Sequence, residues 1–129
     1  AVAYTDHEET VSAVESALRL SASDVSPGAD AIRRLGEGWV GEEALAIALY
    51  AVLVSDTFEQ AIRLAANHDG DSDSTASIAG QIWGAWDPVS AIPHGWVRRI
   101  DVFEPALMVA SRLFIPNHMS DNGRGEVAR

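Results

Sequence analysis

The longest unbroken apolar stretch of the chain is ALAIALYAVLV at residues 44–54, which follows directly on Glu42 and Glu43. It is well short of the roughly 20 apolar residues that a membrane-spanning helix needs. We therefore expect a buried helix over residues 42–54 and no membrane segment. Sustained two-residue alternation of β-branched residues, the pattern of a half-buried strand, is absent from the sequence. The pattern predicts an all-α fold.

Three pairs of side chains mark expected helix starts. In each pair a Thr or Asp precedes a Glu by three positions, which is the spacing of a capping box. The pairs are Thr5 with Glu8, Asp56 with Glu59, and Asp101 with Glu104. Helices are expected to follow over residues 6–20, 57–67 and 102–114. The segment LGEGWVGEE, which precedes the apolar helix, predicts a glycine-punctuated turn.

A fifth helix is expected over residues 74–86. One of its faces carries only small residues at a spacing of four, namely Ala76, Gly80 and Gly84. Such a face lets a neighbouring helix approach closely, and we expect this packing inside a soluble bundle. Trp83 and Trp86 are expected to cover the hydrophobic core.

Composition limits the size and the partners of the protein. The 129 residues, 47% hydrophobic and 22% charged, fit one globular domain, which we place at residues 1–115. The polar residues 116–129 are expected to form a flexible tail. The formal net charge is −10 and the few basic residues are scattered arginines, which argues against a nucleic-acid partner. Without Lys or Cys the chain forms no Walker-type phosphate loop, Schiff base or thiolate site, and we expect a cytoplasmic protein.

The stretch ANHDGDSDSTASIAG at residues 65–79 carries unusual chemistry. Three carboxylates, Asp69, Asp71 and Asp73, alternate along it, and hydroxyl side chains follow. Like charges this close need a positive neighbour. Capping of the next helix by Asp73 or Ser72 would account for one acid. For three acids we favour a bound hard cation, because such cations prefer carboxylate and hydroxyl oxygens.

An EF-hand calcium loop is a rival form of cation site. Its first, third and fifth positions would be the three aspartates of this stretch. That loop also requires Gly at position six and a bidentate Glu at position twelve, where the sequence has Ser74 and Gly80. We therefore discount calcium.

The residues around the acidic stretch resemble a known family. NHDGDSDSTASIAGQIWGA is preceded by LGEGWVGEEALAIALYA and followed by AIPHGW. In this order the segments resemble the C-terminal half of the ADP-ribosylglycohydrolases, an all-helical family that includes the dinitrogenase-reductase-activating glycohydrolases. The centre of the resemblance is the motif G-D-x-D-[ST] at residues 70–74. The motif alone is weak, whereas its combination with the flanking segments is specific.

The resemblance implies a binuclear magnesium site, which manganese also occupies in some members. The ligands from this half would be Asp71, Asp73 and the Ser74 hydroxyl. The metals would hold the substrate ribose and position a water for attack at the anomeric carbon, releasing ADP-ribose from a modified protein or small molecule. Trp39 and Val40 lie in the turn that borders the nucleotide cleft in this family, and Trp39 would either stack on adenine or fill the core. No catalytic residue is assigned beyond the metal ligands.

Four neighbouring side chains are given no catalytic role. Magnesium prefers oxygen ligands, so His68 is expected to pack or to form ordinary hydrogen bonds. Glu42 and Glu43 open a helix, where the helix dipole accounts for acidic residues. Asp69 stands where many family members have Gly, and we expect it to be exposed or to lie just outside the ligand set.

The chain departs from the family in one large respect. The N-terminal half of the family supplies the other metal ligands through a G-D-x-x-G element and an S-D-D-T-like element, and neither occurs here. The chain also begins without Met, so we expect a piece of a longer enzyme whose missing N-terminal half is its partner. A non-catalytic metal-binding or structural helical module is the alternative. Alone, the chain is expected to bind magnesium weakly, to lack turnover and to form homodimers through exposed apolar surface.

Overall fold

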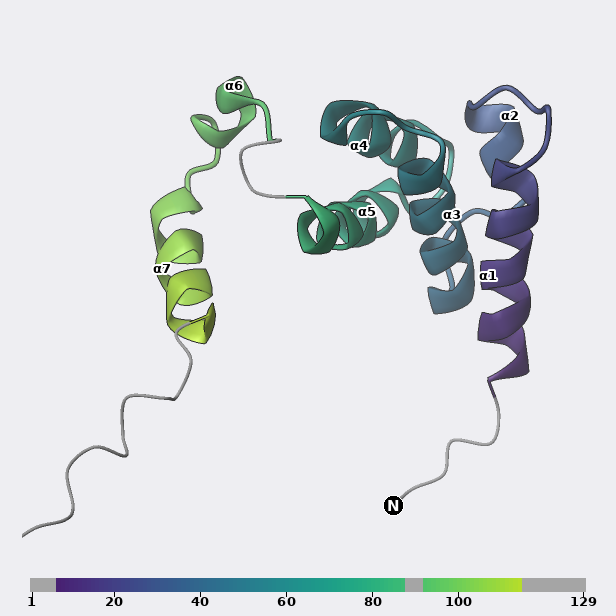
Figure 1. Cartoon of the computed structure of the whole chain (residues 1–129), viewed down its shortest axis with the longest axis horizontal. Helices are drawn as coiled ribbons and strands as arrows, with labels where there is room; N and C mark the ends of the chain where they lie inside the picture. The colour runs from purple at the N-terminus through teal and green to yellow at the C-terminus, as the bar shows by residue number, and fades with distance from the viewer. Residues whose placement is uncertain (1–6, 88–91, 115–129) are drawn as a thin grey trace, which may run out of the picture. The chain divides into compact units, whose positions relative to one another are not determined.

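A computed structural model describes residues 7–87 and 92–114 (Figure 1). No strand occurs within these residues, which confirms the all-α prediction. They divide into two compact units, one ending at Ile92 and the other beginning at Pro93, so the unit boundary lies inside the range expected to be one domain. The expected tail at 116–129 lies outside the described residues. No helix of the described part is long and apolar enough to cross a membrane.

Most helices lie within a few residues of their predicted bounds. In the described part of the first unit they are α1 (Glu8–Ser21), α2 (Ala29–Ile32), α3 (Gly41–Leu53), α4 (Phe58–Ala66) and α5 (Ser72–Trp86). The second unit contains α6 (His94–Val97) and α7 (Phe103–Phe114). The sequence did not predict α2 and α6, because a single turn is too short to show helical periodicity.

Helix α3 is the centre of the first unit, since it contacts α1, α4 and α5. Seven of its 13 residues are buried, and its apolar run leaves it without a polar face. A helix that is hydrophobic on all sides needs neighbours on all sides. One hydrophobic cluster joins α3 to α4 and α5, and a second joins it to α1 and α2. The predicted buried helix is confirmed.

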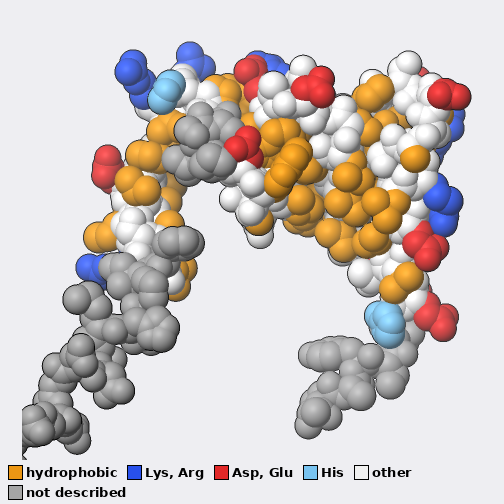
Figure 2. Space-filling model, in the orientation of Figure 1, with side chains coloured by type: hydrophobic (Ala, Val, Ile, Leu, Met, Phe, Trp, Pro, Cys, Tyr) orange, Lys and Arg blue, Asp and Glu red, His pale blue; other side chains and the backbone are white. Residues whose placement is uncertain are grey.

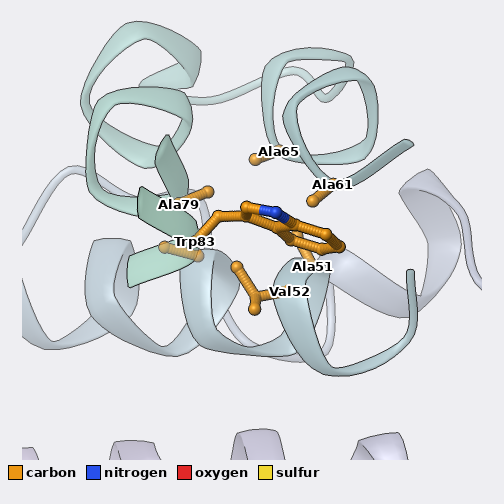
Figure 3. Packing of buried hydrophobic residues seen from close by; sticks show 7 residues of the cluster. Ala51, Val52, Ala61, Ala65, Ala79 and Trp83 are labelled. Carbon is orange, nitrogen blue, oxygen red and sulfur yellow. The ribbon is translucent and has the colours of Figure 1, made fainter. Parts of the chain in front are cut away.

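Trp83 fills the centre of the cluster between α3, α4 and α5. Its indole lies among small side chains from three helices, Ala51, Val52, Ala61, Ala65 and Ala79 (Figure 3). The alanines let the helices approach closely, and one large ring fills the remaining space. Trp86 packs on this ring with a centroid distance of 5.3 Å, yet 72% of its surface is exposed. Trp83 therefore lies inside the core, where the sequence had predicted a residue that covers it, and Trp86 covers the core only in part.

The small residues of α5 are used differently from the prediction. The buried face of α5 consists of Thr75, Ala79 and Trp83. A methyl group at Gly80 would be 3.6 Å from Ile62 Cδ1, an ordinary contact, and one at Gly84 would meet no atom of the described residues within 4 Å. The prediction that Gly84 permits close helix packing is wrong in this chain. Ala76 packs against the core cluster and Gly80 lies beside Ile62 of α4, as expected for this face, while the fully buried small residue of α5 is Ala79.

The N-cap residue of α4 is one position later than predicted, at Thr57 in place of Asp56. Thr57 is the N-cap residue, and its hydroxyl accepts a hydrogen bond from the Gln60 N–H at 3.2 Å. The Gln60 side chain accepts in turn from the Asp56 N–H at 3.0 Å. The predicted pairing of Asp56 with Glu59 is therefore wrong, because the Thr57 hydroxyl and the Gln60 amide satisfy these backbone groups.

Candidate metal loop

The predicted metal ligands lie together at the beginning of α5. Asp71 is the N-cap residue, and its side chain forms no capping hydrogen bond. Asp73 and Ser74 follow in the first turn of the helix. The interpretation in which Asp73 or Ser72 is the N-cap residue is wrong, because the helix starts earlier than predicted. The Asp71 carboxylate therefore forms no hydrogen bond that caps the helix.

Asp71 and Asp73 lie two positions apart at the start of α5. Hydrogen bonding with the Asp71 side chain, and then with the backbone N–H groups of Ser74 and of Asp73 itself, holds the pKa of Asp73 below its ordinary value. Asp73 is exposed, while Asp71 and Ser74 are half-buried. The fold therefore brings two predicted ligands together at a helix N-terminus, where free N–H groups favour negative charge.

The donor atoms of this loop suit one part of a magnesium site. Two carboxylates and a hydroxyl are hard oxygen donors, which magnesium and manganese prefer. Magnesium also requires near-octahedral coordination, so these donors leave positions to fill. Within the described residues, no group of three or more His, Asp or Glu side chains gathers where it could hold a metal ion. The loop fits a metal that takes further ligands from elsewhere.

Thr75, which is fully buried, holds the loop from the side of the core. Its hydroxyl donates to the Ala65 carbonyl at 2.7 Å and lies 2.9 Å from His68 Nε2. His68 Nδ1 accepts a hydrogen bond from the Gly70 N–H at 3.1 Å, so the ring proton is on Nε2 and is donated to Thr75. The predicted hydrogen-bonding role of His68 is confirmed.

A glycine-rich turn at residues 36–38 holds the same loop from the other side. The Asp71 N–H donates to the Glu37 carbonyl at 2.8 Å. A Cβ atom at Gly70 would lie 1.7 Å from that carbonyl oxygen, so only Gly permits this approach of the two backbones. The turn predicted from LGEGWVGEE therefore packs directly against the acidic loop.

Trp39 and Val40 continue from this turn, and 66% and 53% of their respective surfaces are exposed. The Trp39 indole N–H donates to the Glu37 carboxylate at 3.1 Å. The interpretation in which Trp39 fills the core is wrong for this chain. Stacking of Trp39 on adenine stays a prediction.

Asp69 lies outside the pair of predicted ligands, as expected, and is exposed. Its carboxylate binds Arg33 at 2.9 Å, and Arg33 also pairs with Asp30. The hydrogen bond and the charge of Arg33 hold the pKa of Asp69 below its ordinary value. The sequence contains no local signal for this pairing, because the two residues are 36 positions apart.

Two residues that shape the loop were given no such role from the sequence. Thr75 follows the motif, and in the sequence it cannot be distinguished from the other hydroxyl residues at the start of the helix. Only its complete burial in the structure shows its different role. From the sequence, Glu43 is explained by the helix dipole, which favours acidic residues in the first turn. In the structure its carboxylate also accepts hydrogen bonds from the turn at 36–38. The glycines of that turn are the one feature of the sequence that indicates a close approach of another group, but they do not show that this group is Glu43.

Comparison with known proteins identifies relatives that match between 42% and 84% of this chain. An ADP-ribosylarginine hydrolase, Tri1 of Pseudomonas putida, is 36% identical over 115 residues, which is 84% of this chain and 30% of the relative. Tri1 of Serratia proteamaculans is 40% identical over 56% of the chain and 20% of its own length. The ADP-ribosyl-[dinitrogen reductase] glycohydrolase of Rhodospirillum rubrum is 37% identical over 42% of the chain and 18% of its own length.

The chain thus spans less than a third of the length of these relatives. No solved structure matches it. The sequence model of ADP-ribosylglycohydrolases matches residues 1–122. Since this match extends over nearly the entire sequence and includes the acidic loop and the adjoining turn, the chain belongs to the ADP-ribosylglycohydrolase family.

Proposed function

We propose that this chain supplies the metal-binding part of an enzyme that hydrolyses the glycosidic bond between ADP-ribose and a modified acceptor. The observation that carries the proposal is the placement of Asp71, Asp73 and Ser74 at the N-cap and first turn of α5, with no capping hydrogen bond from the Asp71 side chain, in a chain of this family. The Pseudomonas and Serratia relatives are named ADP-ribosylarginine hydrolases. We therefore favour a protein modified on Arg as the substrate.

Asp71, Asp73 and Ser74 would hold magnesium or manganese as part of a binuclear centre. When bound, such paired ions clamp substrate oxygens and promote the ionisation of a water. The chain itself keeps two carboxylates close together, by anchoring the loop to Glu37 on one side and to Thr75 on the other. This anchoring offsets part of the repulsion between like charges before a cation arrives.

The remaining ligands must come from another segment in this proposal, because three oxygen donors do not complete octahedral coordination. We assign them to a segment corresponding to the part of the Pseudomonas putida relative that this chain does not span. The indole of Trp39 is exposed and is hydrogen-bonded to Glu37, whose backbone binds the acidic loop. It offers a flat face on which adenine can stack. Val40 would border the same nucleotide site.

Titration of the full chain with Mn²⁺, followed by electron paramagnetic resonance, tests the metal site. We expect weak binding, and a loss of affinity of about tenfold or more in the variants Asp71→Asn and Asp73→Asn, since each removes a ligand charge. Asp69→Asn is the matched control, because it removes the same charge from the same loop outside the proposed ligands. Equal affinity of Asp71→Asn and Asp69→Asn, or tight zinc binding without manganese binding, would contradict the assignment.

A chimera tests the reaction. The matched stretch of this chain replaces the corresponding segment of the Pseudomonas putida relative, and ADP-ribose release from a protein modified on Arg is measured with excess magnesium. We expect turnover by the chimera and a decrease of about 100-fold on Asp71→Asn, because metal ligation contributes several kcal/mol to transition-state stabilisation. Undiminished turnover by an Asp71→Asn, Asp73→Asn double variant would refute the proposal.

A further inference from the structure

The Glu43 carboxylate enters the glycine-rich turn and binds its backbone. Glu43 Oε2 accepts hydrogen bonds from the N–H groups of Glu37 and Gly38, each at 3.0 Å. The path of the side chain is open because Gly36 has no Cβ, which would otherwise lie 2.4 Å from Glu43 Cδ. The backbone of Gly36 also has a φ of +119°, which side chains rarely allow. The turn is therefore shaped around this one carboxylate.

The same turn holds the acidic loop in place. The Glu37 N–H is bound by Glu43, and the Glu37 carbonyl accepts the Asp71 N–H at 2.8 Å. Glu43 and Asp71 thus bind the two polar backbone groups of one residue. Trp39 is tied to this residue as well, through the Glu37 carboxylate. A displacement of the turn would move the Asp71 backbone and the Trp39 indole together.

We infer that Glu43 is a positioning residue for the acidic loop, and the inference rests on the proposed function of that loop in metal binding. Two hydrogen bonds of 3.0 Å to one carboxylate oxygen fix the positions of two successive N–H groups, so they restrict the turn. Through Glu37 this restriction extends to Asp71, and it holds the Asp71 backbone in place at the start of α5. Glu43 does not itself bind metal or substrate.

The neighbouring Glu42 separates this role from a simple effect on the helix. Both residues lie in the first turn of α3, where negative charge is favoured by the helix dipole. Glu42 forms no side-chain hydrogen bond within the described residues, whereas Glu43 binds the turn. A role limited to the helix dipole would make substitutions at the two positions equivalent.

The experiment compares Glu43→Ala, Glu43→Gln and Glu42→Ala in the full chain. The first measurement is hydrogen exchange of the Asp71 amide by NMR, relative to the amide of Tyr50 in the core. We expect exchange at Asp71 to be about tenfold faster in Glu43→Ala, with the Tyr50 amide changed much less. Glu43→Gln keeps a neutral acceptor oxygen and is expected to fall between Glu43→Ala and the unsubstituted chain. Glu42→Ala is expected to leave the Asp71 amide unchanged.

The second measurement is the affinity for Mn²⁺, which we expect to weaken about tenfold in Glu43→Ala and to stay within about twofold in Glu42→Ala. Equal exchange at Asp71 in Glu43→Ala and Glu42→Ala would overturn the inference. So would a uniform increase at Asp71 and Tyr50, since that is a loss of global stability. If Glu43→Ala does not fold, the ratio of the two exchange rates in Glu43→Gln decides.

The two measurements also separate the failure of this inference from that of the proposed function. A complete absence of Mn²⁺ binding in the unsubstituted chain contradicts the metal site, and with it the proposal that Glu43 positions the acidic loop for metal binding. Intact Mn²⁺ binding with no response to Glu43→Ala leaves the metal site standing and removes Glu43 from it.

Discussion

A single buried hydroxyl, that of Thr75, links the acidic loop to the core. It joins the His68 ring to the carbonyl at the end of α4, and through His68 it reaches the Gly70 N–H. Buried polar groups of this kind are costly when they lose a partner. The sequence predicts the carboxylates that face solvent, whereas the hydroxyl beneath them acquires its role only through burial.

Replacement of Thr75 by Val is expected to destabilise the chain by about 2 kcal/mol, because it leaves the His68 Nε2–H and the Ala65 carbonyl without this partner. Thr75→Ser keeps the hydroxyl and loses only a methyl group, so about 1 kcal/mol is expected. Urea unfolding measures both values, and the Gly70 amide should exchange faster in the Val variant alone. A Val variant as stable as the unsubstituted chain would show that the hydroxyl network contributes nothing.

The helices show where local sequence rules succeed and where they are off by one position. The bounds of α3 follow within one residue from its apolar run, which acts locally, whereas α5 begins two residues earlier than predicted and without a side-chain cap. The capping pair at the start of α4 was placed one residue too early, because Asp and Thr at adjacent positions are both good N-cap residues. Only the backbone geometry shows that Thr57 takes this position.

The register of the α4 cap can be tested by two alanine substitutions. Thr57→Ala is expected to lower the free energy of unfolding by about 1 kcal/mol, since it removes the acceptor for the Gln60 N–H. Asp56→Ala, the matched control, is expected to cost less than half of that, because its side chain forms no cap. Urea unfolding of both variants checks this, and a larger cost at Asp56 would restore the pairing predicted from the sequence.

At the scale of the first unit, apolar side chains remain uncovered. Figure 2 shows hydrophobic side chains gathered on one face of this unit, where α3 and α5 lie. Between residues of α3 and α5 and of the segment after α3, a hollow of about 290 Å³ is lined by Leu49, Val52, Leu53, Ser55, Ile82 and Trp86. Leu53 and Trp86 are themselves exposed. Contiguous apolar surface of this kind favours association.

We therefore expect the isolated chain to dimerise reversibly in a concentration-dependent way, as analytical ultracentrifugation would measure. Leu53→Gln and Trp86→Ser should weaken the dimer by about tenfold each, because each removes roughly 1–3 kcal/mol of apolar burial. Leu18→Gln is the control, since Leu18 is an exposed apolar residue of α1 outside the hollow. A chain that stays monomeric at high concentration would contradict the prediction.

The sequence by itself determined the all-α class, the approximate positions of the longer helices and the placement of Asp71 and Asp73 near a helix start. These features depend on residues only a few positions apart, so helical spacing, caps and motif order are enough to predict them. Only the tertiary structure decided that Arg33 binds Asp69, that Glu43 holds the turn which anchors Asp71, and that Trp39 is exposed. The two contacts and the exposure of Trp39 depend on how the helices pack around α3. No local pattern in the sequence specifies this packing.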